Sequence, residues 1–253
     1  MPAYSRPPVR EAIIDIQIDT LAKEYLPKIE SCGSQLQSRY PKKSAFYREE
    51  VSMEVSDTGM TSKRNRQLFG YRFQSSDERK SVRCSLDGFT FKLLKPDPQD
   101  AWLGWSVLRG EAQTAWEHYA EATVTREIKR FAVRYINPIV IPAGKQLRDY
   151  FTSIPVIPEG LPRDLRTFFC RVAVHHKNPE ATIVITQVPI TFDRHTTGTQ
   201  VVLDIDIQRE QRVAVDSFDL WGELDRFRDV KNTVFEASLS PTAKHLFSPK
   251  EEH

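Results

Sequence analysis

Apolar and polar residues alternate along much of this chain, and this pattern predicts a protein built mainly on β-sheets. Near the N-terminus, Ile14, Ile16 and Ile18 fall on one face of a strand spanning residues 9–19, with polar residues between them. The Asp87-Gly88 pair predicts a tight hairpin. Period-two patterns predict further strands at 46–55, 68–73, 81–86, 89–94, 131–142, 167–176, 182–192 and 199–209.

Helical spacing of apolar residues marks the remaining long segments. It predicts a helix over 21–39, weakened by Pro27 and Gly33, and another over 106–123. A long helix is expected to end near Ala237, with Asp216 or Ser217 as its N-cap. Its inward-facing residues are expected to be Leu220, Leu224, Phe227 and Val234. Shorter helices are expected at 145–151 and 240–247.

The order of these elements predicts the fold class. Four strands and a helix follow the first strand and helix, and then four strands and a helix come again. Such meanders, with helices grouped between them, are typical of α+β proteins with largely antiparallel sheets and helices packed on those sheets. We therefore expect two strand-then-helix halves, residues 1–125 and 126–253, joined in one compact unit.

Composition and charge narrow the class of protein. The 253 residues are 40% apolar, and 36 basic against 34 acidic residues give a formal net charge of +2. Generic nucleic-acid binders are usually more basic. The three cysteines are odd in number and far apart, so no disulfide framework is expected, and a cytoplasmic location is predicted. No run of residues has the apolar length of a membrane span, and no signal peptide is predicted.

The segment FAVRYINPIVIP, residues 131–142, places two polar side chains in an otherwise apolar strand. Arg134 and Asn137 supply guanidinium and amide donors, which together are suited to clamp an anion or a carbonyl group. The alternative is structural. In that interpretation, Arg134 points to the opposite face of the strand from Phe131, Val133 and Tyr135, and it ties the strand to Glu11 or Asp204. Asn137 precedes a proline and marks a bulge or a sheet edge.

Acidic residues gather on two strands. Asp204 and Asp206 are two positions apart, so they share a face, and Glu11 and Asp15 stand on the first strand. If those strands are neighbours, the carboxylates are suited to hold Mg²⁺, which prefers oxygen ligands. The alternative is a solvated sheet face of alternating polar residues.

A basic region begins at Lys63, Arg64 and Arg66, which we expect in a loop between strands, and continues to Arg83. Interleaved aromatic residues make it a candidate nucleic-acid-binding surface, on which cations follow the phosphates and bases stack. Acidic neighbours in the sequence favour the alternative of a mixed, solvated surface.

Tryptophans cluster around the second expected helix. Trp102 and Trp105 precede it and are candidates for binding a partner protein, because exposed tryptophans are frequent interface hot spots. The alternative is that they belong to the core, as we expect for Trp116.

Several segments together resemble an uncharacterised bacterial protein family of about this length. They are PPVREAIIDIQ (7–17), LGW (103–105), RYINPIVIP (134–142), LDIDI (203–207) and DRFRDVKNTVFEASLSPTAKHLF (225–247). The resemblance spans nearly the whole chain in order. It implies a bacterial or phage origin and an accessory gene context, in which a role in antiviral defence or toxin control fits.

The function most consistent with these patterns is a non-catalytic interaction protein that binds a protein from the same operon. Walker A, GxGxxG and GxSxG motifs are absent from the sequence. Two alternatives stay open. One is an enzyme or sensor for a phosphorylated ligand that uses Arg134 with Asp204 or Asp206 and Mg²⁺. The other is a nucleic-acid-binding subunit that uses the Lys63 to Arg83 region. A homo-oligomer is compatible with all three, and no membrane association is expected.

Overall fold

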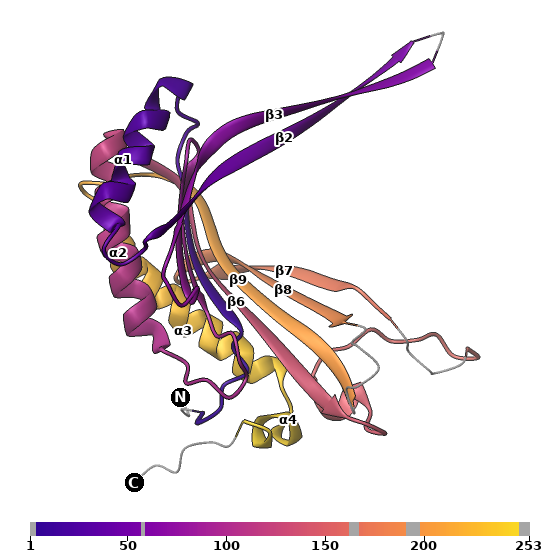
Figure 1. Ribbon diagram of the computed structural model, residues 1–253. Coiled ribbons are helices and arrows are strands. Elements are labelled where there is room, and N and C mark those ends of the chain that lie inside the picture. The colour runs from indigo at the N-terminus through magenta and orange to yellow at the C-terminus, as the bar shows by residue number, and fades with distance from the viewer. Residues whose placement is uncertain (1–3, 57–58, 162–166, 191–197, 248–253) are drawn as a thin grey trace.

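Within the described residues of the computed structural model, nine strands form one antiparallel sheet, in the order β2-β3-β4-β5-β1-β6-β9-β8-β7 (Figure 1). The structure describes residues 4–56, 59–161, 167–190 and 198–247, with the side chains of residues 50–63 excepted. The strands are β1 (Glu11–Gln17), β2 (Lys42–Ser56), β3 (Gly59–Gln74), β4 (Lys80–Ser85), β5 (Gly88–Leu94), β6 (Glu127–Pro142), β7 (Cys170–Lys177), β8 (Glu180–Ile190) and β9 (Gly198–Ala214).

The helices lie along one face of this sheet. They are α1 (Leu26–Leu36), α2 (Gly104–Thr123), α3 (Leu220–Ser238) and the short α4 (Pro241–His245), with 3₁₀ turns at Lys23–Tyr25 and Leu147–Asp149. Helix α1 contacts β3, α2 contacts β5 and β1, and α3 contacts β9 and β6 (Figure 1). None of the described helices is long and apolar enough to cross a membrane. The antiparallel sheet and the helices packed on it confirm the predicted α+β class.

The structure does not show the expected division into two halves, residues 1–125 and 126–253. Strand β1 lies between β5 and β6, pairing Ile14 with Phe91 on one side and with Val133 on the other. Strands from both ends of the chain therefore join one continuous sheet, because β1 bridges the early strands to the later ones.

The core forms between the helices and the inward positions of the strands. Ala12, Ile14 and Ile16 of β1 are fully buried, as their alternation predicts. On β6, Phe131 stacks on Phe227 of α3 with ring centres 5.3 Å apart. This apolar layer fixes the position of α3 over β6, which matters for the pocket described below.

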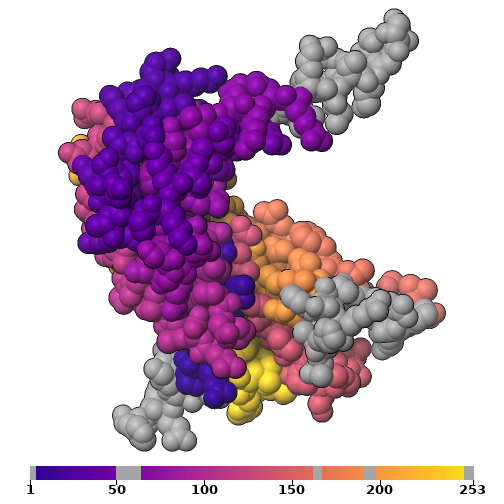
Figure 2. Space-filling view, in the orientation of Figure 1, coloured from indigo at the N-terminus to yellow at the C-terminus, as the bar shows by residue number. Residues whose placement is uncertain are grey.

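The opposite face of the sheet carries no helix in the described part of the chain. The hairpin of β2 and β3 projects away from the body, and Figure 2 shows the molecule hollowed between that hairpin and the β7–β8 side. Polar and charged side chains of the central strands face this hollow, which explains why these strands alternate so regularly.

Three local predictions need correction. Residues 62–66 belong to strand β3 and not to a loop, because their backbone pairs with β2. The cap of α3 is Asp219, whose side chain accepts a hydrogen bond from the Gly222 N–H at 2.9 Å, and not Asp216 or Ser217. The β4–β5 hairpin is confirmed, but Ser85 pairs with Gly88, so Leu86 and Asp87 form its turn.

Candidate functional site: an aromatic pocket around Lys231

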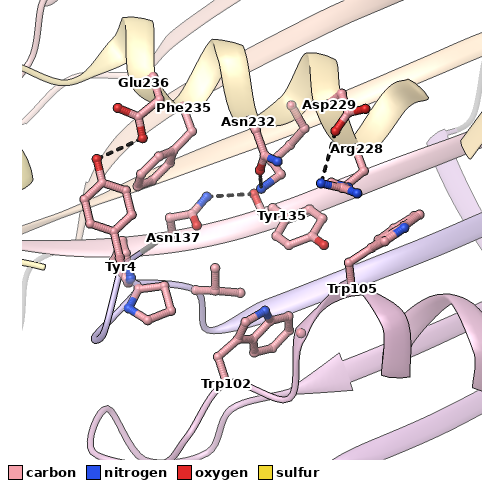
Figure 3. Close-up of a pocket in the computed structure, with 15 residues that line it drawn as sticks. Tyr4, Trp102, Trp105, Tyr135, Asn137, Arg228, Asp229, Asn232, Phe235 and Glu236 are labelled. Atoms are coloured by element: carbon pink, nitrogen blue, oxygen red, sulfur yellow. Dashed lines mark hydrogen bonds and ion pairs between the residues drawn. The ribbon is translucent and has the colours of Figure 1, made fainter. Parts of the chain in front are cut away.

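A pocket of about 440 Å³ opens on the helix-covered side of the molecule, between β6, α3, the start of α2 and the N-terminal segment (Figure 3). Fifteen residues line it: Tyr4, Pro7, Pro8, Val9, Trp102, Gly104, Trp105, Tyr135, Asn137, Arg228, Asp229, Lys231, Asn232, Phe235 and Glu236. Concave, largely apolar sites with a few convergent polar groups are typical ligand-binding sites.

Aromatic rings form the walls of this pocket. Trp102 meets Tyr135 edge to face, with ring centres 6.3 Å apart. Tyr4 meets Phe235 in the same way at 6.1 Å. Trp102 and Trp105 are partly buried, and Figure 3 shows both rings on the α2 side of the pocket, facing α3. The two candidate partner-binding tryptophans therefore belong to one site.

Trp105 is held in place by a contact between two helices. Its Nε1 donates a hydrogen bond to Asp225 Oδ1 of α3 at 2.6 Å. Arg109 Nε, one turn further along α2, donates to the other oxygen of the same carboxylate at 3.1 Å. The shared carboxylate fixes the rim of the pocket, because it joins the first turns of α2 to α3.

Lys231 is the most unusual side chain of the pocket. It is only 8% exposed, and its Nζ lies 4.0 Å from the centre of the Tyr135 ring. It also donates a hydrogen bond to the Asn232 side-chain oxygen. Among the described residues it has no carboxylate partner. Burial, aided by the nearby Arg228 charge, lowers the pKa of the Lys231 ammonium to about 7, far below its ordinary value.

The other charges of the pocket are compensated locally. Arg228 Nη1 lies 3.1 Å from Asp229 Oδ1. Glu236 accepts a hydrogen bond from the Tyr4 hydroxyl at 2.8 Å and pairs with Lys244 at 3.2 Å. Lys231 thus forms no ion pair with a described carboxylate, although the charges of Glu236 and Asp229 act on it at longer range and oppose the fall in its pKa.

Asn137, one of the two predicted ligand-binding residues, lines the floor of the same pocket. It is 1% exposed, and its amide nitrogen donates to the main-chain oxygens of Tyr135 at 3.3 Å and Leu203 at 3.0 Å. Both amide hydrogens are therefore used on the backbone, but Asn137 pairs in register with Leu203 in a central strand, so the expected bulge or sheet edge does not lie at this position. The carboxamide oxygen is the polar atom that remains for a ligand.

Arg134, the other predicted ligand-binding residue, projects from the uncovered face of β6. Its guanidinium pairs with Asp204 of β9, with Nε 2.9 Å from Oδ1 and 3.1 Å from Oδ2. Arg134 and Asn137 therefore lie on opposite sides of the sheet and cannot form a single clamp, because residues of opposite parity on a strand face opposite ways.

Asp206 lines a second hollow, of about 320 Å³, on the uncovered face. Its Oδ2 lies 3.6 Å from Arg130, and its buried Oδ1 has no hydrogen-bond partner. Burial raises the pKa of the Asp206 carboxyl. Asp204 is engaged by Arg134, and the described residues contain no group of three or more metal-ligating side chains. The proposed Mg²⁺ site therefore has one free carboxylate at most.

The predicted basic region lies on strand β3, remote from the aromatic pocket. Arg64 and Arg66 are exposed, and Arg66 stacks over the Tyr47 ring at 4.1 Å. The Lys63 side chain lies outside the described residues.

Lys231 was missed by the sequence reasoning, although the sequence contains its signal. It falls on the same helical stripe as Leu224, Phe227 and Phe235, because the successive positions 224, 227, 231 and 235 are three, four and four residues apart. A lysine on the apolar stripe of a helix requires a special environment, because burial of an ammonium is costly.

Four of the five segments quoted for the resemblance supply residues to this pocket, and LDIDI (203–207) does not. PPVREAIIDIQ supplies Pro7 to Val9, LGW supplies Gly104 and Trp105, and RYINPIVIP supplies Tyr135 and Asn137. The C-terminal segment supplies the six residues of α3. No protein-family model, curated protein or solved structure matches the chain.

Proposed function

We propose that this chain is a non-catalytic interaction protein, whose aromatic pocket receives an anchoring group of a partner protein. The observation that carries this proposal is the position of Trp102 and Trp105, partly buried at the edge of a preformed cavity. Protein interfaces concentrate their binding energy in such sites, where an anchor fills a pocket with aromatic walls and a polar rim excludes water.

The charged residues around the pocket fit that anatomy. Arg109 and Asp225 form an ion pair beside Trp105, with 31% and 40% of their side chains exposed. Exposed pairs of this kind contribute little affinity but favour one orientation of a partner. The resemblance adds the gene context. A product of an adjacent gene in a bacterial accessory operon, with a role in antiviral defence or toxin control, is the proposed partner, and the cytoplasm is the proposed compartment.

Co-expression with the adjacent genes tests the proposal. A product that co-purifies with the wild-type chain should be lost from Trp102→Ala, because the cavity loses one of its walls. Val140→Ala is the matched control, since Val140 is 53% exposed on β6 and does not line the pocket. Circular dichroism verifies that both variants fold. Equal recovery of the partner with Trp102→Ala, or no co-purifying product, contradicts the proposal.

A second candidate function concerns the hollow of the uncovered face. There, Asp206 Oδ1 and Arg83 Nε are buried without hydrogen-bond partners, and Arg72 and Lys92 add positive charge. These features favour a phosphorylated ligand bound directly or through Mg²⁺. A thermal shift with Mg²⁺ and nucleotides that disappears in Asp206→Ala supports this function, and the absence of any shift rejects it.

A further inference from the structure

We infer that the anchoring group taken by the aromatic pocket is a carboxylate carried on an apolar or aromatic group, with Lys231 as its counter-ion. This inference rests on the proposed binding role of the pocket and names the chemistry of the group that binds. The geometry of Lys231, the balance of charges around it and the aromatic walls each support it.

The charged groups around Lys231 support a negatively charged ligand. The groups that face Lys231 are Arg228, Asp229, Asn232 and Glu236 of α3, Tyr135 of β6 and Tyr4 of the N-terminal segment. The arginine is paired with its neighbouring aspartate, and the glutamate is paired with Lys244 and Tyr4. Lys231 is left without a directly paired negative charge, since Glu236 and Asp229 act on it only at longer range. A buried charge is stable only when paired and hydrogen-bonded, so a single negative charge is the complement of this site.

The hydrogen-bonding capacity of Lys231 points the same way. An ammonium group has three N–H donors. The described contacts use one for the Asn232 oxygen, and the face of the Tyr135 ring receives the charge without accepting a conventional hydrogen bond. Donor capacity therefore remains for an acceptor that enters the pocket, and charge-assisted hydrogen bonds to carboxylates are the strong ones.

The walls specify what carries the carboxylate. The rings of Trp102, Tyr135 and Phe235 surround the cavity with apolar surface, which favours an aromatic or branched aliphatic group beside the acid. Arg228 pairs with Asp229 through Nη1, and its buried Nε has no hydrogen-bond partner among the described residues, so it is a further donor beside Lys231. The C-terminal carboxylate of a partner that ends in an aromatic residue has the required chemistry, and so does a free aryl acid.

Acid and amide pairs of the same probe test the inference on the wild-type protein. One arm compares phenylacetate with phenylacetamide. The other compares a short peptide that ends in phenylalanine as the free acid with the same peptide as its C-terminal amide. Tryptophan fluorescence and calorimetry report binding. Each acid should bind at least tenfold more tightly than its amide, since hydrogen bonds to charged groups are worth about 1.5–3 kcal/mol.

The pH dependence provides a readout that needs no variant. A bound carboxylate favours the ammonium form, so binding takes up a proton. Affinity for the acids should fall about tenfold for each pH unit above about 7, while affinity for the amides should not change.

Lys231→Met should remove the difference between acid and amide. Lys177→Met, which removes one exposed positive charge on β7 away from both pockets, should leave that difference intact.

The outcomes separate the two levels of the proposal. If acid and amide bind equally, or no acid binds at millimolar concentration, the inference is overturned. If phenylacetate binds and the peptide acid does not, Lys231 does recognise a carboxylate, but the proposed protein partner loses its support. If the adjacent-gene product binds equally to wild type and to Lys231→Met, the proposed function stands and the carboxylate inference fails.

Discussion

Lys231 Nζ of α3 lies 4.0 Å from the centre of the Tyr135 ring on β6, so a buried ammonium rests on an aromatic face. The ring stabilises the cation electrostatically, by about 0.5–2 kcal/mol in such arrangements. That is less than the cost of removing an ammonium from water, which is why the pKa of Lys231 falls to about 7.

The stability of the protein should carry the signature of this lysine. Its pKa is about 7 in the folded state, against an ordinary value of 10.5. Between these values the unfolded chain keeps a proton that the folded chain has lost, so the free energy of unfolding rises with pH. Below pH 7 both states are protonated, and the folded state bears the whole cost of burying the charge.

Lys231→Met should therefore be most stabilising at low pH. Its advantage over wild type should shrink by about 1.4 kcal/mol for each pH unit between roughly 7 and 10, since one pKa unit corresponds to that energy. Urea unfolding of both proteins across this range measures the difference, in which the contributions of other groups cancel. Parallel stability profiles would show that Lys231 is not perturbed.

Substitution of Asn137 should cost more stability than substitution of Arg134. Asn137→Ala removes two hydrogen bonds that a buried side chain donates to the main-chain oxygens of Tyr135 and Leu203, which should cost about 1–3 kcal/mol. Arg134→Ala removes an ion pair whose arginine side chain is 45% exposed, and such pairs contribute about 0–1 kcal/mol. Chemical denaturation of the two variants provides the comparison, and the reverse order would refute it.

Two glycines should respond oppositely to alanine. A Cβ on Gly70 of β3 would lie 2.2 Å from the Cys84 main-chain oxygen, so Gly70→Ala forces adjacent strands apart and should cost more than about 2 kcal/mol. Gly110 of α2 has no atom within 4 Å of the added Cβ. Gly110→Ala should stabilise by about 0.5–1 kcal/mol, because alanine is the better helix former. Thermal unfolding of both variants measures the effect, and a destabilised Gly110→Ala would contradict it.

The corrected N-cap of α3 makes a further prediction. Asp219→Ala removes the acceptor of the Gly222 N–H and should cost about 1 kcal/mol. Asp216→Ala, at one of the positions first expected to cap the helix, should change stability by less than about 0.5 kcal/mol. Equal losses in the two variants would mean that the cap does not lie at Asp219.

The elements were predictable because this sheet is covered by helices on one face only. That arrangement imprints a two-residue period, as in Ile14 and Ile16 of β1, and the order of strands and helices follows from it. Strand neighbours were not predictable. The pairing of β1 with β6 joins residues more than a hundred positions apart, and no local pattern encodes such pairings.

The site was only partly predictable for the same reason. Trp102, Trp105 and Asn137 were singled out as unusual in their own segments, but their meeting in one pocket depends on how α2, α3 and β6 pack. Lys231 was not predicted, because the apolar residues around it on the helix account for the amphipathic pattern without it. The spacing to Phe227 and Phe235 shows that a charged residue within an apolar stripe is as informative as a polar residue within an apolar strand.

The central position of β1 has a consequence for synthesis on the ribosome. Strands β2 to β5 and β1 can pair while the chain is still short, but β6 emerges only from residue 127 onward. Until then, β1 presents an open row of N–H and C=O groups in a strand rich in isoleucine, the kind of edge at which nascent chains associate. A fragment that ends at residue 125 should therefore aggregate, whereas extension through β6 should protect that edge.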